Sequence, residues 1–426
     1  MKIAVTGTIG SGKSTLCAKL AALLPGFTVV SVDDVVRSIY GDADFLAHLQ
    51  KDFGVGSRKE ASDLVFADPD KRHALEQLSL RYVRPKLAAA LEVNNAIVEF
   101  PLLFEMSDFA TRADLVVAVG CDDATQETRV VARDKMSLEK LNTVRASQYS
   151  RELRAALSDV YVDTGLPPEQ QERAIATIVA RVHEHQLEER ALGFFGQDAG
   201  PALWQAIRTR YTESQRHYHT LAHLHELFAA LAPHLAGHPF ARAIELAVWF
   251  HDIVYETSPA LYPTNEAQSA KEMLRLLGKH LPTWLRIECL MHAQVYLAAE
   301  IIVATKTHKM HAAWVRAKPE HLAAAELFMD ADMAILATPQ PRLSEYDAQI
   351  SREWGQTPGL ESFEFCSGRF NALRGFKTAG PVFMTTEFQE LESAAQANID
   401  HLMDFWQHRL TVLNRELVTV AKTASP

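Results

Sequence analysis

The most constraining feature of this sequence is a phosphate-binding pattern near its start, at residues 7–14. The run GTIGSGKS fits G-x-x-x-x-G-K-[S/T] in full. It follows the apolar run KIAVT (2–6) and precedes the helical pattern STLCAKLAALL (14–24), which is the strand, loop and helix context that the pattern requires. A glycine-rich turn that binds nothing rarely satisfies both the pattern and its context. We therefore predict a nucleotide-binding domain of the α/β class.

The residue types in this loop suit phosphate chemistry. Glycines let backbone N–H groups surround phosphate oxygens, and the positive end of the following helix adds to the attraction. We expect Lys13 to reach the outer phosphates of a nucleotide and to act in catalysis, and Ser14 to ligate Mg²⁺. The residues expected to contact the nucleotide are Gly7, Thr8, Ile9, Gly10, Ser11, Gly12, Lys13, Ser14 and Thr15.

Further apolar runs predict a parallel sheet. They are FTVVSV (27–32), AIVEF (96–100) and LVVAVG (115–120), with helix-like stretches between them. Asp33 ends the strand predicted at the first of these runs, and Glu99 lies at the end of the second, so both carboxylates are expected at the edge of the sheet near the phosphate loop. There Asp33 would serve as a general base or as an acid linked to Mg²⁺, or else it would only cap the next helix.

After about residue 170 the pattern changes to amphipathic helices, as in ARAIELAVWFHDIVY (241–255). We predict an α/β domain over residues 1–190, with helices on both faces of its sheet and a helical lid. The glycine-containing stretch 191–202 is expected to be a linker. An all-α domain is expected over residues 203–426.

Composition excludes several classes of protein. The 426 residues carry 43 Lys and Arg against 53 Asp and Glu, a formal net charge of -10, which gives no general attraction to nucleic acid. No apolar run approaches the roughly 20 residues that span a bilayer, and the opening residues MKIAVTGTIGSGKS have neither the long apolar core nor the small-residue cleavage site expected of a signal peptide. The 4 cysteines are far apart in the sequence. We therefore expect a cytoplasmic protein with small-molecule substrates and neither nucleic acid nor membrane as partner.

The first half resembles the dephospho-coenzyme A kinase family. The resemblance is carried by TGTIGSGKST (6–15), Ser31-Val32-Asp33, VFADP (65–69) and PLLFE (101–105). It implies ATP and Mg²⁺ as cofactor and transfer of the ATP γ-phosphate to the 3'-hydroxyl of dephospho-coenzyme A. Asp33 is then the base, and Pro101, Leu102 and Glu105 contact the substrate.

The helical pattern ETRVVARD (127–134) places Arg129 and Arg133 on one face, where they would clamp the transferring phosphoryl group; the alternative is a solvated charged face. The resemblance implies that this region is the lid. Three positions depart from the family pattern: Ser31 replaces an Asp, Leu80 replaces a His-Pro pair, and Val144 replaces an Arg beside which Arg145 stands.

The second half is rich in histidine: 14 of the 18 histidines lie between residues 183 and 321. His251 and Asp252 are adjacent in a mostly apolar helical pattern, so burial demands a partner for them, either a metal ion or a hydrogen bond in the core. His219 and His223 are four residues apart, on one face if that segment is helical. The other candidate ligands are His308, Asp330 and Asp332.

Imidazole and carboxylate ligands suit Mn, Fe, Ni, Co or Zn. One ion would take one upstream histidine, His251, Asp252 and one Asp of the pair Asp330 and Asp332, while His308 and the remaining histidine would hold a second ion. Such an ion lowers the pKa of a bound water toward about 7, which predicts hydrolysis of a phosphate ester.

The second half also resembles the HD superfamily of metal-dependent phosphohydrolases. The resemblance is carried by RHYHTLAH (216–223), WFHDIVY (249–255), NEAQSA (265–270), ATKTH (304–308) and DADMAIL (330–336). It implies an all-helical HD domain and favours His223, His251, Asp252 and Asp332 as ligands. The predicted protein is a bifunctional kinase and phosphohydrolase with an unidentified phosphate ester as second substrate. The alternative is an active kinase whose HD domain is a non-catalytic, metal- or nucleotide-binding regulatory module.

Overall fold

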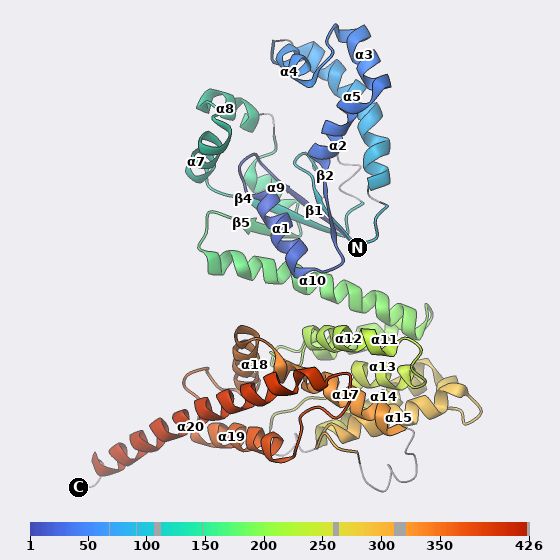
Figure 1. Cartoon of the computed structure of the whole chain (residues 1–426), viewed down its shortest axis with the longest axis vertical. Coiled ribbons are helices and arrows are strands. Elements are labelled where there is room, and N and C mark those ends of the chain that lie inside the picture. Colours follow the sequence, from blue (N-terminus) through green and yellow to red (C-terminus); the bar gives the residue numbers. More distant parts are fainter. Residues whose placement is uncertain are drawn as a thin grey trace. The chain divides into compact units, whose positions relative to one another are not determined.

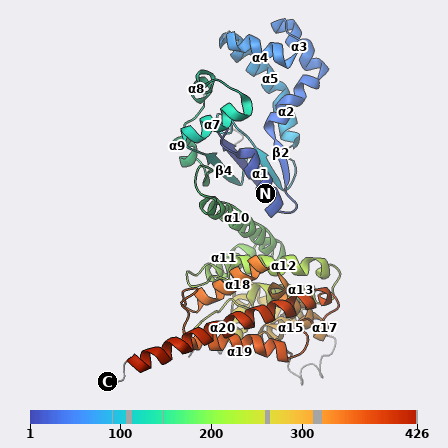
Figure 2. The ribbon, with the colours of Figure 1, turned by 60° about the vertical axis from the view of Figure 1, so that its left-hand side comes forward.

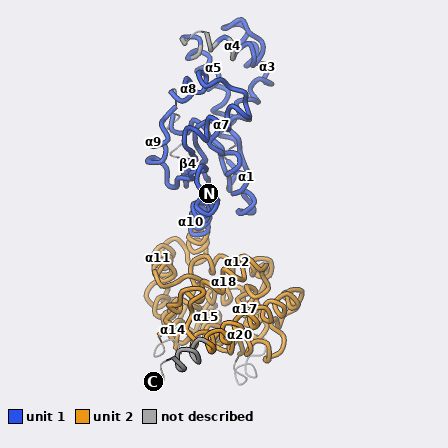
Figure 3. The backbone as a smooth tube through the Cα atoms, turned by 90° about the vertical axis from the view of Figure 1, so that its left-hand side faces the viewer, with its two compact units in different colours: residues 1–185 blue, residues 186–426 orange. Residues whose placement is uncertain are grey.

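The computed structural model describes residues 1–67, 69–90, 92–105, 112–146, 148–258, 264–310 and 321–423. The chain divides into two compact units, residues 1–185 and 186–426, shown in blue and orange in Figure 3. The first unit is built on a parallel sheet and the second on helices, so the predicted order of an α/β part and a helical part is confirmed.

The first unit contains one five-stranded sheet in the order β2-β3-β1-β4-β5, and every pair of neighbouring strands is parallel. The strands are β1 (Lys2–Gly7), β2 (Thr28–Ser31), β3 (Ala96–Glu99), β4 (Leu115–Gly120) and β5 (Val160–Asp163). The helices are α1 (Lys13–Leu23), α2 (Val32–Ser38), η1 (Ile39–Gly41), α3 (Ala43–Phe53), α4 (Arg58–Ala67), α5 (Pro69–Ala90), α7 (Asp123–Asp134), α8 (Leu138–Ala146), α9 (Arg151–Ala156) and α10 (Pro168–Phe195).

Helices cover both faces of this sheet (Figure 1). Successive strand residues point to opposite faces: Ile3 and Val5 of β1 pack into a core with α1 and α10, whereas Ala4 packs into a second core with α2, α3 and α5. A parallel sheet buried on both faces explains why its strands read as continuous apolar runs. Since all strands are parallel, their carboxyl ends lie at one edge, where the phosphate loop follows β1.

The second unit is helical (Figure 2). Its elements are α11 (Gly200–Tyr211), α12 (Leu221–Leu235), α13 (Ala241–Phe250), α14 (Asn265–His280), η3 (Pro282–Leu285), α15 (Leu290–Ala304), α17 (Leu322–Met333), η5 (Ala334–Ala337), α18 (Gln340–Glu353), α19 (Phe363–Thr378), η6 (Gln389–Leu391) and α20 (Glu392–Thr423). Helix α13 lies at its centre and contacts α12, α14, α15 and α17. Residues 246–251, at the end of α13 and directly after it, are all buried. This is expected for a helix that is enclosed by other helices.

The predicted linker at 191–202 differs from the structure. Helix α10 continues to Phe195, and α11 begins at Gly200, so only a short turn separates them. Ala191, Phe194 and Phe195 are buried in the core of the second unit. Of the glycines that suggested a linker, Gly193 lies inside α10 and Gly200 begins α11. Gly196 lies in the turn and has a positive φ of 83°, a conformation that glycine adopts readily.

Among the described residues, helices of the length and apolarity needed to cross a membrane are absent.

Candidate functional site

The phosphate loop joins β1 to α1 through two glycines in left-handed backbone conformations. Gly10 has φ 72° and Gly12 has φ 96°. A Cβ atom on Gly10 would lie 2.6 Å from Cγ2 of Val130, so the loop admits no side chain there. Gly12 directly precedes Lys13, the first residue of α1. The loop therefore brings the N-terminus of α1 to the edge of the sheet, the arrangement that binds anionic phosphate groups.

Lys13 and Ser14 lie at this helix N-terminus. The Lys13 amine is largely buried and donates a hydrogen bond to the carbonyl oxygen of Thr8, 2.9 Å away. Burial lowers the pKa of Lys13, while the carboxylates of Glu99 and Asp33 act in the opposite direction. The Ser14 hydroxyl donates to Oε1 of Glu99 at 2.7 Å. A hydroxyl beside a carboxylate offers oxygen donors of the kind that Mg²⁺ prefers.

Glu99 was expected to face the crevice but not to contact Ser14. It ends β3, the strand next to β1 in the sheet. The sequence signal that could have indicated this contact is the position of the Glu99 carboxylate at the C-terminal end of a predicted parallel strand.

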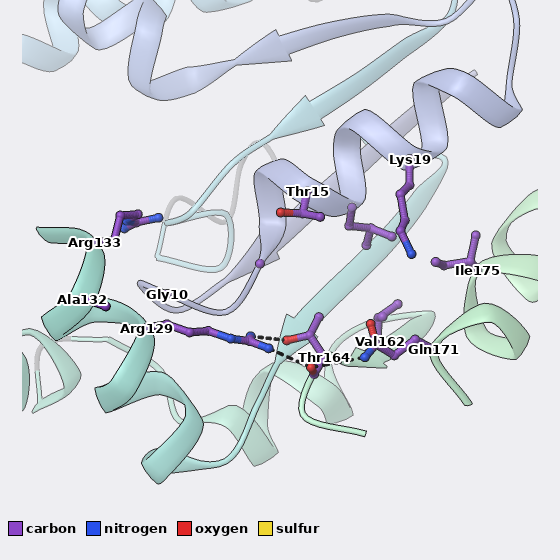
Figure 4. Close-up of a pocket in the computed structure, with 12 residues that line it drawn as sticks. Gly10, Thr15, Lys19, Arg129, Ala132, Arg133, Val162, Thr164, Gln171 and Ile175 are labelled. Atoms are coloured by element: carbon purple, nitrogen blue, oxygen red, sulfur yellow. Dashed lines mark hydrogen bonds between the residues drawn. The ribbon is translucent and has the colours of Figure 1, made fainter. Parts of the chain in front are cut away.

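Arg129 and Arg133 of α7 line a cavity of about 640 Å³ next to the loop, together with Gly10, Gly12 and Thr15. Figure 4 shows Arg129 bound to Thr164: Nη1 donates to the Thr164 hydroxyl at 2.7 Å and Nη2 to its carbonyl at 2.9 Å. Arg133 is exposed and forms an ion pair with Asp134. The two guanidinium groups thus differ, with Arg129 fixed by the chain and Arg133 facing solvent at the cavity.

Asp33 lies beyond the strand that was expected to end with it. Strand β2 ends at Ser31, whose side chain caps α2 by accepting a hydrogen bond from the Asp34 N–H at 3.3 Å. Asp33 is therefore exposed in the first turn of α2. Its negative charge partly offsets the lowering of the Lys13 pKa by burial. Ser31, which replaces an Asp of the family pattern, serves as a helix cap.

The segment after β3 is held by an arginine that the sequence did not single out. Arg154 of α9 is buried and donates to the Thr6 hydroxyl at 2.9 Å and to the Pro101 carbonyl at 3.1 Å. It also forms an ion pair with Glu105. Glu105 is thus engaged by Arg154, whereas Leu102 is exposed. Asp68 of the VFADP run lies outside the described residues.

A glutamine connects the predicted lid to the loop. Gln126 of α7 donates to the Thr8 hydroxyl at 3.1 Å and to the Ile9 carbonyl at 2.7 Å. Its own carbonyl accepts a hydrogen bond from Arg145 of α8 at 2.7 Å. Arg145, beside the departure at Val144, therefore supports the loop through Gln126.

In the second unit, the histidine and aspartate candidates converge. His223 of α12 and His251 after α13 face each other with their Nε2 atoms 3.0 Å apart. Oδ1 of Asp332 lies 3.4 Å from the first of these nitrogens, and Oδ2 of Asp252 lies 2.9 Å from the second. His223, His251 and Asp332 each offer one ligand atom within 4.8 Å of the others. We call His223, His251, Asp252 and Asp332 the His-Asp cluster.

The donor atoms of the His-Asp cluster fit a metal ion. Burial and the neighbouring His251 lower the pKa of His223 to about 3. Burial also disfavours a charge on His251, but Asp252 more than offsets this and raises the pKa of His251 to about 9. The two facing nitrogens and the neighbouring carboxylate oxygens are donors of the kind that a divalent cation takes. His251 Nδ1 is 3.2 Å from the Val248 carbonyl, a contact that orients the ring of a ligating histidine.

His219 does not lie on a helix with His223, because Thr220 caps α12 and the helix begins at Leu221. It reaches the cluster from the preceding turn, with Nε2 at 3.7 Å from Oδ2 of Asp252. Its Nδ1 lies 2.7 Å from Oε2 of Glu353. Oε1 of Glu353 accepts the backbone N–H groups of residues 217–219, each at 2.8 Å.

Glu353 is a buried carboxylate at the end of α18. Burial alone would raise its pKa, but His219 and these N–H groups lower it to about 2. Sequence reasoning did not single out Glu353 as a site residue, because its partner His219 lies 134 positions away in the chain.

His308 and Asp330 occupy different positions relative to the cluster. His308 Nε2 lies 3.5 Å from Oδ2 of Asp332. Asp330 is buried and turns away: its carboxylate accepts hydrogen bonds from the backbone of Met384 and from the backbone and hydroxyl of Thr385. Residues two apart on helix α17 face different directions, so only Asp332 joins the cluster.

Two further polar groups border the cluster. Arg216 is buried and donates to the carbonyls of Asp252 at 2.7 Å and Ile253 at 3.1 Å, which fixes the turn after α13. Oε2 of Glu266 is buried and lacks a hydrogen-bond partner within the described part of the chain. Burial raises the pKa of Glu266, and it interacts electrostatically with Lys306, Asp252 and His308.

The parallel sheet, the phosphate loop with Lys13, and the arginines of α7 define the first unit as a phosphate-loop kinase. The family model described as Dephospho-CoA kinase matches residues 1–166. The chain belongs to this family through its N-terminal unit, so the first unit is a kinase of that family.

The sequences of two dephospho-CoA kinases agree with this assignment. The dephospho-CoA kinase of Xanthomonas campestris pv. campestris (strain 8004) is 32% identical over 203 residues, which cover 44% of this chain and 97% of that protein. The enzyme of Escherichia coli (strain K12) is 30% identical over 198 residues, covering 44% of this chain and 93% of its own length. A solved structure of dephospho-CoA kinase from Campylobacter jejuni aligns at 22% identity and a TM-score of 0.33, covering 43% of this chain and 98% of that one. The resemblance of the second half to the HD superfamily stays a prediction.

Proposed function

We propose that the first unit transfers the γ-phosphate of ATP to the ribose 3'-hydroxyl of dephospho-CoA, and that Asp33 is the general base. The Lys13 amine is hydrogen-bonded to the loop at the Thr8 carbonyl, which supports a role for it at the outer phosphates. Arg129 and Arg133 line the adjoining cavity, which supports a role for them in neutralising charge on the transferring group. Asp33 takes the proton of the acceptor hydroxyl, and Mg²⁺ is bound at Ser14. We assign Pro101, Leu102 and Glu105 to the acceptor side.

We also propose that the second unit hydrolyses a phosphate ester at the His-Asp cluster. The observation that carries this proposal is the convergence of His223, His251 and Asp332 on one point. These ligand types suit a divalent ion such as Mn, Fe, Ni, Co or Zn. When bound, such an ion supplies an activated water and compensates the charge of the phosphate.

The chain supports this chemistry through its own contacts. Glu353 orients His219 by binding Nδ1, which directs Nε2 toward Asp252. Arg216 holds the backbone of Asp252. The ligands are thus fixed by buried charged groups before any substrate arrives, as a preorganised site requires.

The test is phosphate release by the full chain with Mn²⁺ and without added ATP, across a panel of phosphate monoesters. We expect one class of ester to be hydrolysed, and we expect Asp252→Ala to abolish that turnover together with bound metal, measured by elemental analysis. Asp400→Ala is the matched control, since Asp400 is an exposed carboxylate that pairs with Lys377. Absence of turnover with metal bound would instead favour the non-catalytic binding module.

A further inference from the structure

A second cavity, of about 410 Å³, lies in the helical unit and is lined mainly by apolar side chains. We call it the apolar pocket. Its apolar lining comes from α17, α19 and the segment between α19 and α20: Met329, Met333, Phe376, Val382, Phe383 and Met384. Its volume falls within the range of roughly 300–1,000 Å³ that is typical of small-molecule sites.

The apolar pocket adjoins the His-Asp cluster. His308 lines the pocket, and its Nε2 atom lies 3.5 Å from Oδ2 of Asp332. Met333, also in the lining, directly follows Asp332 on α17. The Phe376 ring meets the His308 ring edge-on, with 5.8 Å between centroids. A molecule with its phosphate at the cluster can therefore place its remaining atoms in the pocket.

The wall of the pocket at residues 382–385 is fixed by two carboxylates. Glu392 accepts the backbone N–H groups of Val382 and Phe383, each at 2.9 Å. Asp330 accepts those of Met384 at 2.9 Å and Thr385 at 2.7 Å. Hydrogen bonds to ionised groups are the stronger kind. Four consecutive N–H groups are thus held on charged partners while the side chains of residues 382–384 line the cavity, so the pocket is formed in advance.

We propose that the apolar pocket binds the alcohol portion of the substrate, and that the second unit acts on phosphate monoesters of apolar alcohols. This inference rests on the proposed hydrolase function. Thioether, aromatic and aliphatic side chains gain from covering an apolar group, whereas a sugar placed against them would bury hydroxyl groups without partners. Lys309, an exposed cation in the lining, lies beside His308, where the ester carries its negative charge.

The reaction is a hydrolysis and needs no other co-reactant. Water supplies the oxygen that forms the new bond to phosphorus, and the bond between phosphorus and the ester oxygen breaks. The departing oxygen takes a proton that originates from water. The products are the free alcohol and inorganic phosphate.

The test compares hexyl phosphate with 6-hydroxyhexyl phosphate, using the full chain with Mn²⁺ and no ATP. The two esters have the same leaving oxygen and differ only by a distant hydroxyl group, so a difference in kcat/KM reports the pocket. We expect hexyl phosphate to be favoured at least ten-fold. Met384→Gln is expected to reduce this ratio below three-fold, and it should fold normally because Met384 is partly exposed. Leu290→Gln, at an exposed apolar position outside the pocket, should keep the wild-type ratio.

The outcomes separate the two proposals. Hydrolysis of both esters with equal kcat/KM, or a ratio unchanged in Met384→Gln, overturns the pocket proposal and leaves the hydrolase function intact. If neither ester is hydrolysed, equilibrium binding of hexylphosphonate and 6-hydroxyhexylphosphonate decides. Tighter binding of hexylphosphonate that is lost in Met384→Gln supports the pocket proposal, even though hydrolysis was not observed. Equal binding of the two phosphonates overturns the pocket proposal.

Discussion

Asp33 and Asp34 are neighbouring exposed carboxylates in the first turn of α2, but they have different surroundings. The charge of Asp33 acts to raise the pKa of the Lys13 amine, whereas Asp34 forms an ion pair with Arg37 at 2.6 Å. If Asp33 is the general base, Asp33→Asn removes the proton acceptor. We then expect kcat for phosphorylation of dephospho-CoA to fall by about 10²- to 10⁴-fold, measured by coupled ATP consumption.

The melting temperature of Asp33→Asn should stay within the error of the wild type, because the exposed side chain contributes little packing. Asp34→Asn is the matched control and should retain nearly full kcat. A turnover of Asp33→Asn within a few-fold of the wild type would rule out its role as the base.

Sequence reasoning at the level of single residues worked where a motif fixes the local geometry. Lys13 and Ser14 could be placed because the loop between strand and helix is read from consecutive residues. Glu99, Arg154 and Glu353 were not assigned their contacts because these partners are distant in sequence: 85 positions to Ser14, 148 to Thr6 and 134 to His219. Only the packing of the elements brings such pairs together.

Helix α17 presents its two aspartates to different surroundings, and this leads to a test of which one binds metal. Asp330 anchors residues 384–385, and Asp332 faces His223 and His308. We expect Asp330→Asn to weaken the hydrogen bonds of this carboxylate and to lower the free energy of unfolding by about 1.5–3 kcal/mol, the typical contribution of hydrogen bonds to charged groups. Bound Mn²⁺ should be retained. Asp332→Asn should lose the metal.

Urea unfolding and elemental analysis of the two purified variants measure these effects. The aspartate pair serves as its own control, because both changes remove one charge from the same helix. Metal loss in Asp330→Asn with metal kept in Asp332→Asn would reverse the assignment of the ligand.

Among the helices and strands, the sequence predicted those with strong hydrophobic periodicity. It did not predict where a capping residue begins a helix. The apolar run of strand β5 (Val160–Asp163) has only three residues, enclosed between Asp159 and Asp163, so it was too short to stand out. His219 and His223 were expected on one helix face only if their segment is helical, and this condition is not met, because Thr220 caps α12 and the helix begins at Leu221. Both histidines still reach the cluster, since a turn also places side chains near a helix terminus.

For the whole molecule, the change from buried strands to amphipathic helices predicted two kinds of architecture within one chain. Continuous apolar runs such as LVVAVG indicated a parallel sheet covered on both faces, and the structure confirms this. The order of the strands and the extent of α10 did not follow from the pattern. Both depend on which side chains share a core, as when Val182 packs in the first unit and Leu187 in the second.

The division of α10 between two cores predicts where the kinase unit can be separated. The family match ends at residue 166, yet Ile175, Ile178 and Val182 are buried in the core beneath the sheet. We expect residues 1–185 alone to unfold cooperatively and to phosphorylate dephospho-CoA at nearly the rate of the full chain. A piece ending at residue 167 loses these three side chains, each worth roughly 1.5–3 kcal/mol when buried.

That loss is comparable to the total stability of roughly 5–15 kcal/mol of an ordinary domain, so the shorter piece should be unfolded and inactive. Thermal melting by circular dichroism and the ATP-consumption assay compare the two pieces directly. If residues 1–185 were inactive but a piece ending at residue 199 were active, the last turns of α10 would belong to the kinase fold. Activity in the piece ending at residue 167 would show instead that the phosphate loop needs no support from α10.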